Sequence, residues 1–171
     1  MKLMGNLCCL AFLVWAISFF VKSEDKQIPS NEVLISQFEK MGIFTPDQWE
    51  KGNVVDGVQV YTAKTDDNIL KSSWLLGVKQ AGVISVTAKN DPAFSVISAL
   101  STCYKLVKGV VARDEKPDFK VVEKAFKQAI SSEPVDNAYS DTEVIADYRF
   151  KVQMGTIGSN LYSYACSIKA K

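Results

Sequence analysis

The segment that follows Asp91 and Pro92 constrains the fold most, because it predicts a long helix that is apolar on nearly every side. Aspartate at a helix cap and proline in the first turn are typical of a helix start. Its predicted buried side contains Val96, Ala99, Leu100, Cys103, Leu106, Val107 and Val110. The remaining polar stripe is narrow and consists of Ser95, Ser98, Thr102, Lys105 and Lys108. A helix of this kind lies at the centre of a domain, packed across a sheet.

The sheet itself is predicted from segments in which apolar and polar residues alternate. Three such strands precede the central helix, at 54–64, 69–78 and 83–89, and two follow the charged segment 113–116, at 143–154 and 161–169. In the segment 143–154, the residues predicted to face the core are Val144, Ala146, Tyr148, Phe150 and Val152, and those predicted to face water are Glu143, Asp147, Arg149, Lys151 and Gln153. Further helices are predicted at 30–41, over a short segment ended by Gly52, and at 117–131. The order α-α-β-β-β-α-α-β-β favours an α+β fold in which helices pack on one face of an antiparallel sheet of about five strands.

The short second helix has the clearest local signal in the chain. Thr45 is a good N-cap, Pro46 occupies the first helical position, and Gln48 completes a capping box. Phe44 and Trp49 are placed to form a hydrophobic staple across this helix start.

The amino terminus has the three parts of a secretory signal peptide. Lys2 supplies the charge, an apolar run interrupted only by Ser18 follows, and Val21-Lys22-Ser23 is a usable cleavage site. The run is shorter than the roughly 20 residues that cross a bilayer as a helix. We therefore expect a signal peptide over residues 1–23 and one domain over residues 24–171. An uncleaved membrane anchor is the alternative.

Cleavage after Ser23 changes both the charge and the cysteine count. Loss of Lys2 and Lys22 lowers Lys+Arg from 20 to 18 against 19 Asp+Glu, a net charge of −1. A near-neutral chain without a basic stripe argues against nucleic acid or an anionic membrane as the main partner. Two cysteines remain, and an exported chain with an even number favours one disulfide over two free thiols.

The disulfide prediction follows from two independent periodicities. Cys103 lies on the predicted core face of the central helix, and Cys166 shares a strand face with Tyr164 and Ile168. A helix lying across a sheet can bring these positions within the 4.4–6.8 Å between Cα atoms that a bridge requires. We expect Cys103 and Cys166 to be joined.

Few kinds of catalytic or metal-binding site are available to the chain, because it contains no histidine. This excludes Ser-His-Asp and Cys-His catalysis and histidine metal sites, and pairing of the cysteines removes a thiolate. The acidic segment 136–143 lacks the spacing and central glycine of a calcium loop. We expect no enzyme activity, no cofactor and no metal.

The sequence thus predicts an exported protein, periplasmic or secreted and of a bacterial kind, that binds another macromolecule, most simply a protein. The envisaged roles are an envelope-assembly component, or an inhibitor or immunity protein. A carrier of a small apolar ligand held between sheet and helices is the alternative, and a hydrolase that uses carboxylates alone ranks below it. The polar loop predicted at 133–142 combines an aromatic residue with acids, so we expect Tyr139 and Asp141 to contribute to binding.

Overall fold

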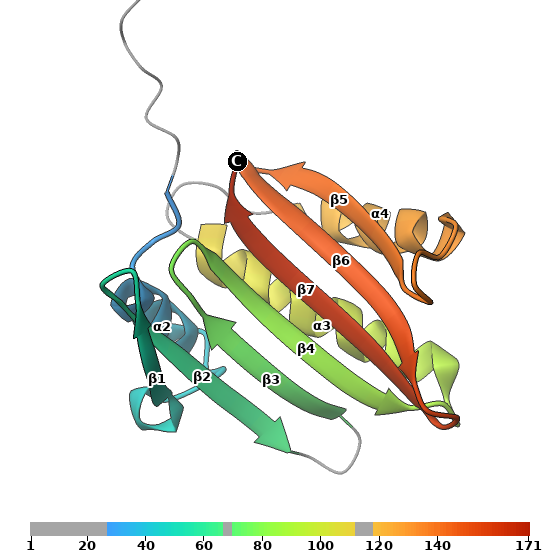
Figure 1. Ribbon diagram of the computed structural model, residues 1–171, viewed down its shortest axis with the longest axis horizontal. Helices are drawn as coiled ribbons and strands as arrows, with labels where there is room; N and C mark the ends of the chain where they lie inside the picture. Colours follow the sequence, from blue (N-terminus) through green and yellow to red (C-terminus); the bar gives the residue numbers. More distant parts are fainter. Residues whose placement is uncertain (1–26, 67–69, 112–117) are drawn as a thin grey trace, which may run out of the picture.

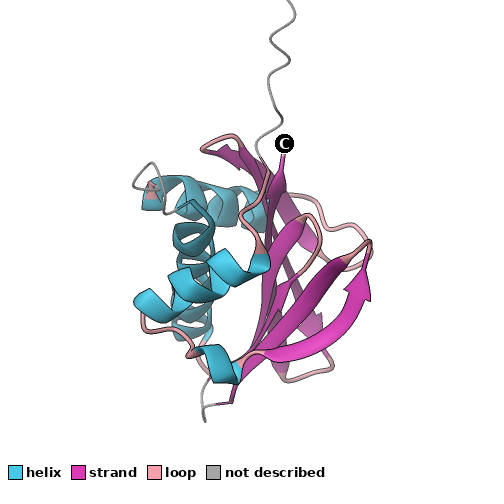
Figure 2. Ribbon diagram, turned by 90° about the vertical axis from the view of Figure 1, so that its left-hand side faces the viewer, coloured by secondary structure: helices cyan, strands magenta, loops and turns pink. Residues whose placement is uncertain are grey.

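The fold is one antiparallel sheet of seven strands with three helices packed against one face (Figure 1). The computed structural model describes residues 27–66, 70–111 and 118–171. The strands lie in the order β1-β2-β3-β4-β7-β6-β5, and Figure 2 shows the helices gathered on a single side of them. The elements are α2 (Asn31–Lys40), a 3₁₀ turn η1 (Pro46–Gln48), β1 (Glu50–Val55), β2 (Val58–Asp66), β3 (Leu70–Leu76), β4 (Gln80–Ala88), α3 (Pro92–Val111), α4 (Phe119–Ser131), β5 (Tyr139–Ile145), β6 (Tyr148–Ile157) and β7 (Leu161–Ala170).

The expected α+β class is confirmed, but the sheet has two more strands than predicted, because two hairpins were missed. The first is in the segment predicted as one strand at 54–64. Asp56 and Gly57, both with positive φ, form a two-residue turn between β1 and β2. Such a turn matches the twist of the paired strands and favours Asp-Gly. Gly52 consequently lies within β1 and does not end a helix.

The second missed hairpin replaces the strand predicted at 143–154. Ala146 and Asp147 have φ of 46° and 67° and turn β5 into β6, with Ile145 paired to Tyr148. A turn of two residues reverses which alternate positions face the helices. Val144 and Ala146, predicted to be buried, therefore lie on the opposite side and in the turn, and Val144 is 50% exposed. The predicted burial of Tyr148 and the alternate residues after it is confirmed.

Helix α3 lies across β4 and β7 as the central helix, as its composition predicted. Asp91 accepts a hydrogen bond from the backbone N–H of Phe94 at the helix start (2.9 Å). The predicted polar stripe is partly wrong, because Ser95 and Thr102 are buried. Their hydroxyls donate to the carbonyl oxygens of Asp91 (2.8 Å) and Ser98 (2.9 Å) one turn earlier, which satisfies them without water. Among the described helices, α3 alone is long and apolar enough to span a membrane, a property that buried core helices share.

The disulfide between Cys103 and Cys166 is confirmed, with 5.7 Å between the Cα atoms. It joins the middle of α3 to β7, and both cysteines are buried. Because such a bond persists in oxidising compartments, it supports an extracytoplasmic environment for the folded chain. The predicted signal peptide and the charged segment 113–116 lie outside the described residues.

The core also contains an aromatic cluster, to which the segment 31–49 contributes most of the rings. The predicted capping box is present: Gln48 Oε1 accepts from the backbone N–H of Thr45 (2.8 Å). The predicted staple packs edge to face, with 5.2 Å between the ring centroids of Phe44 and Trp49. Phe38 of α2 fills the space between Trp49, Trp74 and Gly109 of α3.

Candidate functional site

The face of the sheet opposite the helices is one candidate functional surface of the fold. Figure 1 looks onto this face, which none of the described residues 27–66, 70–111 and 118–171 covers with a helix. We call it the open face. Directly paired residues of neighbouring strands lie on the same side of a sheet. The pairings therefore place these residues across its centre: Leu75, Gly82 and Ser167 in one row, Ser73, Ile84 and Ala165 in the next, and Val86, Ser163 and Gly155 in the third.

The centre of the open face contains glycine, alanine and serine residues together with exposed aliphatic side chains. Ile84, in the middle strand β4, is 51% exposed, and Leu75 beside it is 38% exposed. A centre with exposed aliphatic groups is the arrangement found at the core of protein–protein interfaces.

Charge on the open face has one sign over five strands. Every charged residue at an open-face position of β3 to β7 is basic, namely Lys71, Arg149, Lys151 and Lys169, whereas β2 places Asp66 directly opposite Lys71. Arg149 and Lys169 are directly opposite each other on β6 and β7. Arg149, Lys151 and Lys169 form no ion pair with another described residue. Like charges opposite each other destabilise a sheet, so the fold itself gains nothing from this arrangement.

Sequence reasoning found only part of this surface. The alternation at 143–154 correctly placed Arg149, Lys151 and Gln153 away from the core. It could not find Lys169 beside Arg149, because that proximity depends on the pairing of β6 with β7.

The residues predicted to bind, Tyr139 and Asp141, lie on the other side of the sheet. Both belong to β5 and not to a loop, since the connection from α4 ends at Ala138. Asp136 and Asn137, with positive φ, are enclosed by reciprocal backbone hydrogen bonds between Val135 and Ala138 (2.9 and 3.0 Å). Aspartate and asparagine tolerate this backbone conformation, and the tight turn allows β5 to start earlier than predicted.

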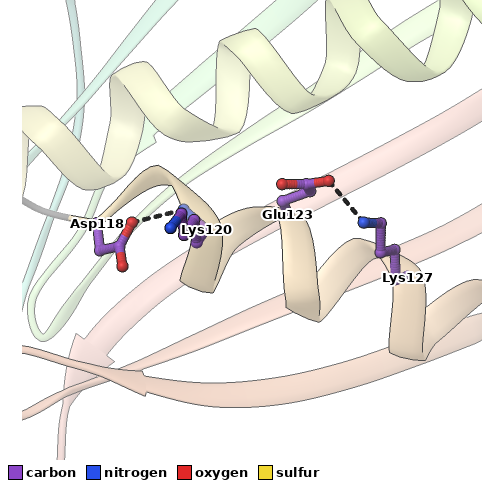
Figure 3. A network of polar contacts seen from close by, with 4 residues as sticks. All are labelled: Asp118, Lys120, Glu123 and Lys127. Carbon is purple, nitrogen blue, oxygen red and sulfur yellow. Dashed lines mark hydrogen bonds and ion pairs between the residues drawn. The ribbon is translucent and has the colours of Figure 1, made fainter.

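Asp141 helps to attach α4 to the sheet. The amide nitrogen of Gln128 on α4, oriented toward the carboxylates, donates to Asp141 (3.2 Å) and Glu143 (2.6 Å). Lys124 also pairs with Glu143 at 2.7 Å. Helix α4 has its own polar contacts, shown in Figure 3: Asp118 caps its first turn through the N–H of Lys120, and Glu123 pairs with Lys127 one turn further on.

Tyr139 lines a pocket of about 610 Å³ at one end of the helix-covered face. The pocket lies between the start of α3, the end of α4 and the strands β5, β6 and β7. Its lining residues are Pro92, Val96, Ile130, Pro134, Asn137, Tyr139, Met154, Gly155, Thr156, Tyr162 and Tyr164, none of which is charged. The lining residues include no pair of carboxylates.

Within the described ranges, no group of three or more His, Cys, Asp or Glu could hold a metal ion. Comparisons of the chain with protein-family models, curated proteins and solved structures found no significant match.

Proposed function

We propose that this protein is an exported, non-enzymatic binding protein that holds another protein on the open face of its sheet. The observation that supports the proposal is the set of unpaired basic residues Arg149, Lys151 and Lys169 on the same face as the exposed aliphatic groups of Leu75 and Ile84. An aliphatic centre with charged residues at its rim is common at interfaces between proteins. Such a surface suits an envelope-assembly component, or an inhibitor or immunity protein, in the periplasm or outside the cell.

The charge of the face indicates the chemistry of the partner. The chain without residues 1–23 has a net charge of −1, so the basic open face reflects a segregation of charge and not a basic protein. A partner with acidic groups around an apolar patch would relieve the repulsion between Arg149 and Lys169. Complementary potentials of this kind steer encounter and determine which partners bind.

A charge-reversal experiment with a matched control tests the proposal. The Arg149→Glu/Lys169→Glu variant reverses two charges on the open face, and Lys105→Glu/Lys108→Glu reverses two exposed charges on α3. Each is isolated with an affinity tag from the exporting host at low and high salt. We expect the unsubstituted protein and the α3 variant to retain one stoichiometric partner protein, and high salt to weaken its binding. The open-face variant should lose this partner. Retention of that protein by the open-face variant would exclude this surface.

The same assay distinguishes binding at the open face from the sequence-based prediction that Tyr139 and Asp141 bind the partner. Both residues lie on the helix-covered side. The Tyr139→Ala/Asp141→Ala variant should keep the partner if the open face binds it, and should lose the partner if the sequence-based prediction is correct.

A further inference from the structure

We propose that the pocket at Tyr139 is a second binding site, separate from the open face, for a neutral and largely apolar small molecule that has a hydrogen-bond-accepting oxygen. The walls of the pocket come from both helices that follow the first four strands and from the three strands at the far edge of the sheet. Its volume of about 610 Å³ lies within the range of roughly 300–1,000 Å³ typical of small-molecule sites.

The absence of charge in the lining determines the first property of the ligand. Apolar walls are supplied by Val96, Ile130 and Met154, together with two prolines. An ion would lose its hydration in such a pocket, which costs several kcal/mol, and no lining residue carries a charge that could pair with it. A neutral ligand avoids that cost and gains from the removal of its apolar surface from water.

Three tyrosines determine the second property. Tyr139, Tyr162 and Tyr164 all line the pocket, and none of their side-chain hydroxyls forms a hydrogen bond with another described residue. Tyr164 as a whole is only 5% exposed, yet its hydroxyl is accessible to solvent and so is free to bind a ligand in the pocket. A ligand carbonyl, ether or hydroxyl oxygen would accept the proton that these phenols offer.

The rings of the same residues favour an aromatic or flat ligand. Tyr162 and Tyr164 lie 6.2 Å apart between ring centroids, and Phe126 stacks on Tyr164 at 6.4 Å between centroids. Lys89 lies over the ring of Tyr162, 5.3 Å from its centroid. These contacts fix the orientation of the two rings before a ligand arrives, so little side-chain freedom is lost on binding.

Access to the pocket is marked by exposed apolar side chains. Ile130 and Tyr139 line it and are 53% and 39% exposed, and Val135, in the connection beside Pro134, is 72% exposed. Apolar groups clustered at the mouth of a cavity are typical of a ligand entrance.

The test uses Prodan, a neutral naphthyl ketone whose fluorescence reports an apolar, hydrogen-bonded environment. We expect saturable binding of one Prodan per chain and weak binding of the anionic probe ANS. Ile130→Lys should lower Prodan affinity at least about tenfold, because it places a charge at the entrance. The matched control Ile97→Lys adds the same charge to an exposed position of α3 that does not line the pocket, and it should bind Prodan normally.

A second variant tests the hydrogen bond. Tyr164→Phe keeps the ring and should lower Prodan affinity by roughly three- to tenfold, the usual effect of one neutral hydrogen bond. It should leave unchanged the affinity for the matching probe in which propyl replaces the propionyl group. Absence of saturable binding, or equal binding by the Ile130→Lys variant, would overturn the proposal. The Arg149→Glu/Lys169→Glu variant leaves the pocket intact and should bind Prodan normally. Its Prodan affinity therefore tests the pocket independently of the open face.

Discussion

Gly109 offers a sharp test of the packing between α2 and α3, because two opposing effects of known size meet at one position. Gly109 lies in the interior of α3, where replacing glycine by alanine ordinarily stabilises a helix by about 1 kcal/mol. In this fold an added Cβ would lie 2.8 Å from Cζ and 2.9 Å from Cδ1 of Phe38, and closer still to Cε1. Carbon atoms at such distances repel strongly, so either the Phe38 ring or the helix must move.

The Phe38 ring has little room to move. It is fully buried, and its centroid lies 5.3 Å from that of Trp74 and 5.9 Å from that of Trp49. Overpacking of a dense core costs about 1–3 kcal/mol, occasionally more, and at this separation we expect the upper end. Gly109→Ala should therefore lower the free energy of unfolding by about 1–2 kcal/mol net, despite the better helix propensity of alanine.

Urea denaturation of the purified, disulfide-bonded protein measures this effect. Ser101→Ala, on the exposed side of α3, is the control and should be nearly neutral. In a Phe38→Leu background the smaller side chain makes room, so Gly109→Ala should cost less or even stabilise, and the two substitutions should couple. A stabilisation of about 1 kcal/mol by Gly109→Ala alone would refute the close approach of the two helices.

Three further predictions concern the bridge, a buried phenol and processing. In a denaturant titration, the free energy of unfolding of the Cys103→Ala/Cys166→Ala variant should be about 4 kcal/mol lower, the value that the chain-entropy relation gives for a separation of 63 residues. An unchanged free energy of unfolding would contradict a bridge that constrains the unfolded chain. Burial, and to a lesser extent Tyr162, raises the pKa of Tyr164 above 10.0, so its stabilising effect should be complete below about pH 10 and lost as pH rises through the folded-state pKa. Tyr164→Phe should reduce that loss in denaturant titrations above pH 10, and identical pH profiles would contradict it. Intact-mass analysis of protein from the exporting host should find a chain that begins at or near Glu24, and retention of Met1–Ser23 in a membrane fraction would contradict cleavage.

The parts of the fold that were predictable are those that depend on periodicity within one element. The burial of Cys103 followed from helical spacing and that of Cys166 from strand alternation, and neither depends on how the strands are connected. The bridge between them could therefore be predicted before the sheet topology was known.

The parts that failed depend on turns. Ala146-Asp147 lacks the Asn-Gly or Asp-Gly pair that normally indicates a two-residue hairpin, so β5 and β6 were read as one strand and Val144 was assigned to the core. Asp56-Gly57 is such a pair, but β1 before it contains polar residues and a glycine and lacks the alternation of apolar and polar residues that predicts a strand.

The candidate sites could be predicted only in part because they are assembled across the sheet. Arg149 and Lys151 were correctly placed in solvent, whereas Lys169 joins them through strand pairing alone. Tyr139 was predicted in a loop, whereas it lies in β5 and lines a pocket that also requires α3, α4 and β7. No local pattern specifies contacts between elements so far apart in the chain.

Site-specific photo-crosslinking in the exporting host tests the central claim, that the open face holds a protein partner, most directly. A photoreactive phenylalanine derivative is placed at Ile84 on the open face or at Ile97 on α3, positions that are 51% and 65% exposed. The account predicts one discrete protein adduct at position 84, its loss in the Arg149→Glu/Lys169→Glu background, and no such adduct at position 97. The same adduct at both positions, or an adduct at position 97 alone, would contradict it.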